Sequence, residues 1–261
     1  MKRAPHNSNF EGIIRLDEIE LWLIDRDAQA PALADIERRS PLLPPGEREQ
    51  AARKVDRTDA ARWLNGRIAL RLLLKPRIGA RAARLPFGVM GGGRPLIADC
   101  DLDFSLSDRG SMLLVAFSRV GRIGVDIESA RPLNISPVRI ARLVAAANGL
   151  AGEHCRQLID PDMVVAWTRI EAFAKATADS LAACLSMLGT AGHIGHPATL
   201  DELRRHAART RYDAAVSVRD LDLPHGLVGA LATPVAAANV NLRIQILDHH
   251  ELSALAERTN G

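Results

Sequence analysis

The sequence predicts an α+β protein of two similar halves, related by a pseudo-twofold axis, with the active site in the cleft between them. Two observations support this fold class: an order of helix, loop and hairpin occurs twice along the 261 residues, and the length suits two fused half-units. The apparent junction lies near Gly121, beside a strand that carries two carboxylates. We therefore expect residues 1–121 to form a basic N-terminal α+β half and residues 122–261 a C-terminal half with the acidic strand.

The first half is predicted from alternation and from breaker residues. Residues 19–24 alternate as a strand does, and residues 47–54 and 59–74 have helical patterns; Pro76 and Gly79 are expected to end the second helix. A hairpin is expected from residues 104–107 and 112–118, which flank the turn Asp108-Arg-Gly110.

The second half begins with a strand over residues 122–128. Residues 136–147 are expected to be helical, and Asp160-Pro161-Asp162 has the composition of a helix start. Residues 212–219 and 227–233 predict a second hairpin, and residues 242–247 a last strand.

Composition indicates an ordinary globular protein with 47% hydrophobic residues and a net charge of +3. Aromatic residues make up only 3%, which disfavours a single-strand nucleic-acid binder. Residues 48–84 contain eleven basic and three acidic residues, so this region suits phosphate-bearing or acidic partners. A nucleic-acid binder that uses this surface is a further alternative, although a phosphate pocket explains the charge more economically.

The cell compartment is expected to be the cytoplasm. Cys100, Cys155 and Cys184 are odd in number, far apart and without a CxxC pair, which is typical of reduced thiols. No signal peptide or membrane span is expected, because charged or polar residues interrupt every apolar stretch.

The candidate site combines the strand and a helix some forty residues later. Asp126 and Glu128 are two residues apart among β-branched residues, so on a strand they point to the same side. Glu171 and Lys175 are four apart in a helical pattern, so they share one helix face. If strand and helix meet, three carboxylates and one ammonium converge, which suits a divalent cation and a phosphate. Each pair alone is commonly only a solvated or helix-supporting pair.

These motifs resemble those of the 4′-phosphopantetheinyl transferases of the surfactin-synthetase-activating type. That family pairs a Gly-x-Asp-x-Glu strand with a Trp-x-x-Lys-Glu-Ala-x-x-Lys helix at about this separation. The resemblance covers roughly residues 42 to 176: the chain also has a basic helix from Arg62, the loop Gly93-Arg94-Pro95, and Phe104-Ser-Leu-Ser107 in the family's order.

The resemblance implies an Mg²⁺-dependent enzyme with holo-acyl-carrier-protein synthase activity. It would transfer the 4′-phosphopantetheine arm of coenzyme A to a serine of an acyl or peptidyl carrier protein, with release of adenosine 3′,5′-bisphosphate. Such carriers serve fatty-acid, polyketide or nonribosomal-peptide biosynthesis. A monomer is implied, with neither nucleic acid nor membrane as partner.

The resemblance also implies a role for each candidate residue. Asp126, Glu128 and Glu171 would hold Mg²⁺ against the pyrophosphate, so that Asp126 also belongs to the coenzyme A site. Glu171 would activate the serine hydroxyl, and Lys175 would bind the pyrophosphate and stabilise the leaving group. The phosphates of coenzyme A would be bound by Arg62, Arg94 and Ser107.

Three departures from the family pattern lead to an alternative function. Asp108 stands where the family has histidine, Ile170 where it has lysine, and Ala178-Asp-Ser-Leu181 where it has a glycine-rich sequence. Arg109, next to Asp108, is expected to point to the other side of the strand. The alternative is a coenzyme A-binding relative with weakened or absent catalysis.

Overall fold

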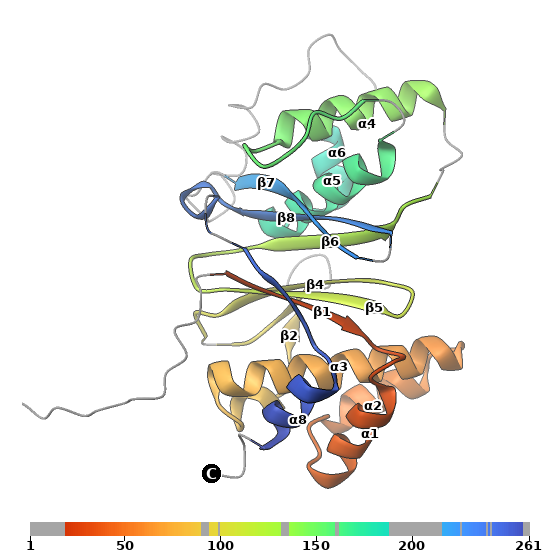
Figure 1. Ribbon diagram of the computed structural model, residues 1–261, viewed down its shortest axis with the longest axis vertical. Coiled ribbons are helices and arrows are strands. Elements are labelled where there is room, and N and C mark those ends of the chain that lie inside the picture. The colour runs from red at the N-terminus through yellow and green to blue at the C-terminus, as the bar shows by residue number, and fades with distance from the viewer. Residues whose placement is uncertain are drawn as a thin grey trace, which may run out of the picture.

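The structure is a computed structural model that describes residues 19–89, 94–98, 100–131, 136–159, 162–187, 216–224, 226–238, 240 and 242–257. It has four layers, with helices on the outside and the two larger of its three described β-sheets between them (Figure 1). The larger sheet has the strand order β4-β5-β1-β9, and the smaller has the order β6-β8-β7. The third sheet is the two-stranded pair β2-β3. The predicted α+β class is therefore confirmed, whereas the pseudo-twofold axis stays a prediction.

The first half of the chain forms most of the larger sheet and its helix layer. Its elements are β1 (Ile19–Asp25), α1 (Ala30–Arg39), α2 (Pro45–Ala52), α3 (Arg57–Ile78), β2 (Gly88–Val89), β3 (Pro95–Leu96), β4 (Asp103–Arg109) and β5 (Met112–Ser118). The predicted first strand, both helices and the hairpin are confirmed. Asp56 caps α3 by accepting a hydrogen bond from the backbone N–H of Asp59 at 2.9 Å.

The predicted end of α3 at Pro76 is wrong, because the helix continues to Ile78. Proline removes one backbone donor, but tertiary contacts hold the last turn in place. The Arg77 guanidinium donates to the carbonyl of Leu73 and forms an ion pair with Glu20 of β1. Gly79, with φ of +87°, then ends the helix as predicted.

The second half of the chain forms the smaller sheet and its helix layer. Its elements are β6 (Gly124–Ser129), α4 (Pro137–Leu150), α5 (Met163–Thr177), α6 (Leu181–Met187), β7 (Val216–Leu221) and β8 (Leu227–Pro234). The antiparallel β7–β8 pair confirms the predicted second hairpin from residue 216 onward, and residues 212–215 lie outside the described residues. Residues 160 and 161 of the predicted helix start lie outside the described residues.

The last described elements return to the first half. Strand β9 (Ile244–Ile246) pairs in parallel with β1, and helix α8 (His249–Glu257) packs against α1 and α3. β9 and α8 belong to the predicted C-terminal half, 122–261, but they lie in the layers that residues 1–121 form. The division of the chain near Gly121 stays a prediction.

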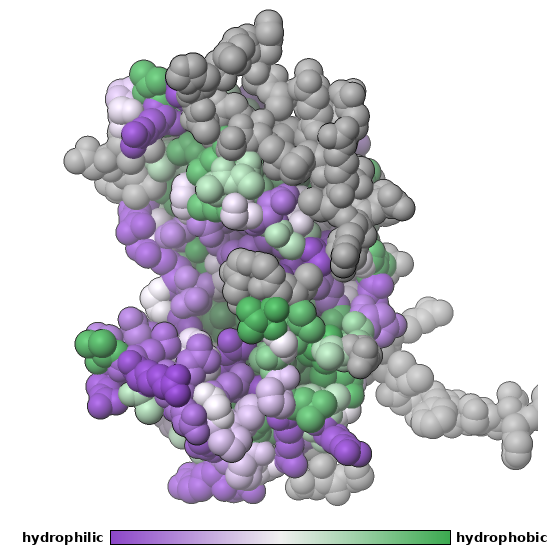
Figure 2. All heavy atoms as spheres, turned by 180° about the vertical axis from the view of Figure 1, so that it is seen from behind, coloured by the Kyte–Doolittle hydropathy of each residue, from purple (hydrophilic) through white to green (hydrophobic). Residues whose placement is uncertain are grey.

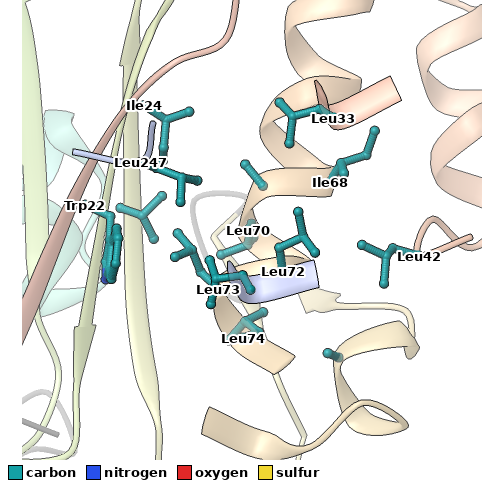
Figure 3. Close-up of a cluster of buried hydrophobic side chains, with 14 of the residues drawn as sticks. Trp22, Ile24, Leu33, Leu42, Ile68, Leu70, Leu72, Leu73, Leu74 and Leu247 are labelled. Atoms are coloured by element: carbon teal, nitrogen blue, oxygen red, sulfur yellow. The ribbon is translucent and has the colours of Figure 1, made fainter. Parts of the chain in front are cut away.

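Three hydrophobic clusters fill the spaces between the layers. One lies between the larger sheet and its helices, where Trp22, Ile24 and Leu247 face the leucines of α3 (Figure 3). A second lies between the two sheets, and a third lies under α4 and α5. Because β1 is covered on both faces, both sets of its alternating side chains include buried apolar residues.

The outer surface is mixed in character. Figure 2 shows hydrophilic residues over much of the face behind that of Figure 1, with hydrophobic residues gathered in a smaller area near its middle. Among the described residues, no helix has both the length and the apolar character needed to span a bilayer. Cys100, Cys155 and Cys184 are free, as expected.

Candidate active site

The two sheets meet along β4 and β6, which are joined by side chains rather than by backbone pairing. Polar side chains at alternate positions of β4 accept hydrogen bonds from backbone N–H groups at alternate positions of β6 and from that of the residue before it. The pairs are Asp103 with Ile123 (2.8 Å), Ser105 with Val125 (3.1 Å) and Ser107 with Ile127 (3.2 Å). Because β6 is an edge strand, these bonds satisfy donors that would otherwise lack a strand partner.

Helix α5 lies directly on β6 because Gly124 has no side chain. A Cβ atom at Gly124 would lie 2.0 Å from the carbonyl oxygen of Ala172 and 2.6 Å from the backbone nitrogen of Ala176. Neither backbone atom can move without the helix, so only glycine permits this approach. The approach brings Glu171 and Lys175, on the same stretch of α5, beside Asp126 of β6.

Asp126 is the centre of this arrangement and is only 3% exposed. Its Oδ1 accepts hydrogen bonds from Ser107 Oγ at 2.7 Å and from Lys175 Nζ at 2.8 Å. Lys175 Nζ also donates to the carbonyl of Val125 at 3.0 Å. The other carboxylate oxygen, Oδ2, is buried without a hydrogen-bond donor among the described residues. Such an oxygen is open to a cation or to a protonated neighbour.

Glu171 is the carboxyl group that lies beside Asp126. Burial raises the pKa of its carboxyl, and the charge of Asp126 raises it further, while the Lys175 ammonium, 3.8 Å away, acts in the opposite direction. Asp126 and Glu171 therefore form a close pair of carboxyl groups, and a bound cation would offset the repulsion between their charges.

Glu128 does not join this pair in the structure. Its Oε2 lies 3.1 Å from Nε of Arg109 and 3.9 Å from a guanidinium nitrogen of Arg131. Within the described ranges, no group of three or more histidine, cysteine or acidic side chains has metal-binding geometry. The three-carboxylate site stays a prediction, in which Glu128 would have to exchange its arginine partners for the metal.

Arg109 and Asp108 point to opposite sides of β4, as expected. Asp108 forms an ion pair at 2.8 Å with the buried guanidinium of Arg26, while Arg109 faces Glu128 on the side of β6. Asp108 therefore already has a cation partner.

The two predicted phosphate-binding arginines have different environments. Arg62 forms an exposed ion pair with Asp27 at 2.6 Å, and this contact holds the pKa of Asp27 below its usual range. No contact between described residues joins Arg62 to the Asp126 cluster. Arg94 instead lies at the site: its guanidinium donates to the carbonyls of Lys175 (2.7 Å) and Phe104 (2.6 Å) and pairs with Asp103.

The structural role of Arg94 was not foreseen from the sequence. It joins α5 to β4 and so holds the backbone of Lys175 in place. The sequence does contain a pattern that indicates a polar contact surface on β4. Polar residues occur at every second position, so they share one side of the strand: Asp103, Ser105, Ser107 and Arg109.

The chemistry of the donor set fits a hard divalent cation. Asp126 and Glu171 supply carboxylate oxygens only, the type of ligand that Mg²⁺ prefers, and Asp126 Oδ2 is buried without a donor. A cation at this pair would offset the negative charge of the two carboxylates.

Comparison with known proteins gives one relative and no match to any protein-family model. The relative is the 4'-phosphopantetheinyl transferase HetI of Nostoc sp. (strain PCC 7120). The two sequences are 28% identical over 174 residues, which cover 64% of this chain and 71% of the relative. This distant similarity supports a relationship to the phosphopantetheinyl transferase superfamily, without distinguishing the surfactin-synthetase-activating type within it.

Proposed function

We propose that the protein transfers the 4′-phosphopantetheine group of coenzyme A to a serine hydroxyl of an acyl or peptidyl carrier protein in the cytoplasm, as a monomeric, two-half enzyme of the surfactin-synthetase-activating type. The observation that carries the proposal is the contact between α5 and β6, which gathers Asp126, Glu171 and Lys175 beside Ser107. The similarity to a phosphopantetheinyl transferase supports the same reaction class.

The transfer requires one bond to form and one to break. The serine oxygen of the carrier attacks the phosphorus that bears the pantetheine arm, and the bond from this phosphorus to the bridging oxygen breaks. Adenosine 3′,5′-bisphosphate leaves with the electron pair. When bound, Mg²⁺ would neutralise negative charge on the pyrophosphate and the leaving group.

Glu171 is the proposed acceptor of the serine proton. Its raised pKa makes its carboxylate a stronger base than an ordinary glutamate. Asp126 and Glu171 would hold the metal, and Glu128 would complete the set by leaving Arg109.

Lys175 is the proposed cation for the pyrophosphate. An ammonium has three N–H donors, and two of them go to Asp126 and the carbonyl of Val125. The third remains for a phosphate oxygen. Arg62 and Ser107 are proposed to contact the coenzyme A phosphates, whereas Arg94 would combine such a contact with its links to Lys175 and Asp103.

The alternative of a weakened coenzyme A-binding relative rests on Asp108 and Ile170. Asp108 is neutralised by Arg26, so it adds no unpaired negative charge near the site. Ile170 is fully buried in the cluster under α4 and α5, so a lysine at that position would point into this core. Both environments favour the active enzyme over the weakened relative.

The nucleic-acid alternative is less well supported. Several basic residues between 48 and 84 already pair with acids within the fold: Arg48 with Glu37, Arg67 and Arg71 with Glu47, and Arg77 with Glu20. Paired arginines contribute less to a field that attracts a polyanion.

The test is incubation with coenzyme A, Mg²⁺ and a panel of apo carrier proteins, with the carrier mass as the readout. We expect a gain of one phosphopantetheine group, which chelation of Mg²⁺ abolishes. Asp126→Ala and Glu171→Gln should remove the gain, whereas Glu49→Gln, an exposed carboxylate on α2, should not. Coenzyme A binding without any mass gain across the panel would favour the inactive relative.

A further inference from the structure

A cavity remote from the Asp126 cluster lies in the helix layer of the first half. Its volume is about 160 Å³, and its walls come from α1, the segment after α1, α3 and α8. The lining residues are Ile36, Arg39, Ser40, Leu42, Leu72, Lys75 and Ala256. Figure 3 shows Leu42 and Leu72 on the side of α3 away from the sheet. The larger sheet separates this cavity from β6.

Lys75 is the unusual member of this lining. It is only 6% exposed, and its side chain has no hydrogen bond or ion pair with any residue of the described ranges. A lysine whose side chain is mostly buried loses hydration without gaining an anionic partner, whereas a methionine or leucine would cover the neighbouring leucines without that cost. Burial lowers the pKa of Lys75, and the charge of Arg84 lowers it further.

Two more cations lie near the same space. Arg39 lines the cavity, and its guanidinium pairs on the outside with Asp35 at 2.7 Å. Arg84 donates a hydrogen bond at 3.0 Å to Ser40 Oγ, which places a third positive charge beside the wall. The acid Asp35 offsets part of the charge of Arg39, and no described acid offsets that of Lys75.

We propose that this cavity binds a small oxyanion, with a phosphate group as its chemical class, and that Lys75 is the main binding residue. A bound oxyanion supplies the partner that the ammonium lacks, and Arg39, Arg84 and the Ser40 hydroxyl add donors at the rim. The volume admits an oxyanion of about five non-hydrogen atoms, since one water needs roughly 10–15 Å³. The apolar walls from Leu42, Leu72 and Ala256 would accept a short apolar substituent on the phosphate.

The first test is thermal unfolding of the full chain in inorganic phosphate against chloride at equal ionic strength. A ligand that binds only the folded state raises the Tm. We expect phosphate to raise the Tm of the wild type, of Lys54→Met and of Lys175→Met, and the rise to be lost in Lys75→Met. Lys54→Met is the matched control for the substitution, and Lys175→Met separates this cavity from the proposed active site.

The second test does not depend on a folded Lys75 variant. The sequence has four lysines, at positions 2, 54, 75 and 175, so their side-chain NMR signals can be assigned singly. The chemical shift of the Lys75 signal should change with phosphate concentration until it reaches a plateau, whereas that of Lys54 should stay unchanged. The proposal would be overturned if phosphate left the Lys75 signal unchanged, or if it raised the Tm of Lys75→Met as much as that of the wild type. A shift with isobutyrate but none with phosphate would overturn the phosphate class.

Discussion

Lys175 Nζ lies 2.8 Å from Asp126 Oδ1, and this contact ties helix α5 to strand β6 at the centre of the candidate active site. The pair is only partly shielded, because Asp126 is buried while Lys175 keeps some exposure. Lys175 Nζ also donates to the carbonyl of Val125, which belongs to the same strand as Asp126. The ammonium is therefore both a neutralising charge for Asp126 and a support for the edge of β6.

Lys175→Met should destabilise the protein by about 2–3 kcal/mol, which is less than the loss for a fully buried pair because Lys175 is partly exposed. The reason is that Asp126 would keep its buried charge without a cation. Urea unfolding followed by circular dichroism measures the loss, with Lys54→Met as control. If Lys175→Met loses no more unfolding free energy than Lys54→Met, the hydrogen bond from Ser107 is sufficient to stabilise the buried Asp126 carboxylate.

Ser107→Ala and Ser105→Ala form a matched pair. Each removes the acceptor of one β6 backbone N–H, so each should cost about 1–3 kcal/mol of unfolding free energy. Only Ser107 also donates to Asp126, so only Ser107→Ala should reduce carrier modification beyond the effect of lost stability. Equal activities of the two variants, measured well below their unfolding temperatures, would contradict a role for Ser107 in the site.

Gly124→Ala should cost about 3 kcal/mol or more, since the new Cβ would collide with the backbone of α5. The same clash would move Glu171 and Lys175 away from Asp126, so carrier modification should also be lost. The control is Gly149→Ala in α4, where no atom lies within 4 Å of the new Cβ. That variant should be neutral or more stable by up to about 1 kcal/mol, because alanine favours the helix. Equal Tm values for the two variants would refute the close approach.

Glu171 should make stability depend on pH in a defined direction. Its folded pKa is raised above the ordinary 4.5, so the folded state holds the proton more tightly than the unfolded state. The stability that the carboxyl contributes is full below pH 4.5 and is lost as pH rises through the folded pKa. Glu171→Gln lacks this loss, so its stability relative to the wild type should increase across that window. Unfolding free energies between about pH 4 and pH 8 test this, and parallel curves would contradict it.

Ala178 offers a substitution that should stabilise the protein. It ends α5 with φ of +57°, the left-handed conformation that glycine adopts without steric cost. Ala178→Gly should therefore raise the unfolding free energy by up to about 1 kcal/mol, and the Tm with it. Ala174→Gly, in the interior of the same helix, is the control and should lower both. A lower Tm for Ala178→Gly would mean that its side chain stabilises more than its backbone conformation costs.

The elements were predictable where a local pattern sets them. Strand β1 and the β4–β5 hairpin follow from alternation, and the helices from their apolar spacing. The end of α3 was wrongly assigned to Pro76, because the contact of Arg77 with Glu20 depends on β1, 57 residues away in the sequence. The parallel pairing of β9 with β1 likewise depends on contacts across more than two hundred residues, for which no local pattern exists.

The site was only partly predictable, because contacts between segments far apart in the sequence again leave no local pattern. Periodicity places Asp126 and Glu128 on one side of a strand, and Glu171 and Lys175 on one face of a helix. It does not say which groups on a facing strand compete for them. Arg109 takes Glu128, and Arg94 binds the backbone of Lys175, because β4 packs against β6 through side chains.

The return of β9 and α8 to the first half has a consequence for synthesis on the ribosome. Leu247, Leu252 and Leu255 belong to the same hydrophobic cluster as Trp22 and the leucines of α3. At roughly 5–20 residues per second, these N-terminal residues leave the ribosome many seconds before their C-terminal partners. During that time, the larger sheet has one open edge and a partly uncovered core, both of which are surfaces that chaperones bind. Translation of residues 244–257 is therefore the step that completes the first half of the molecule.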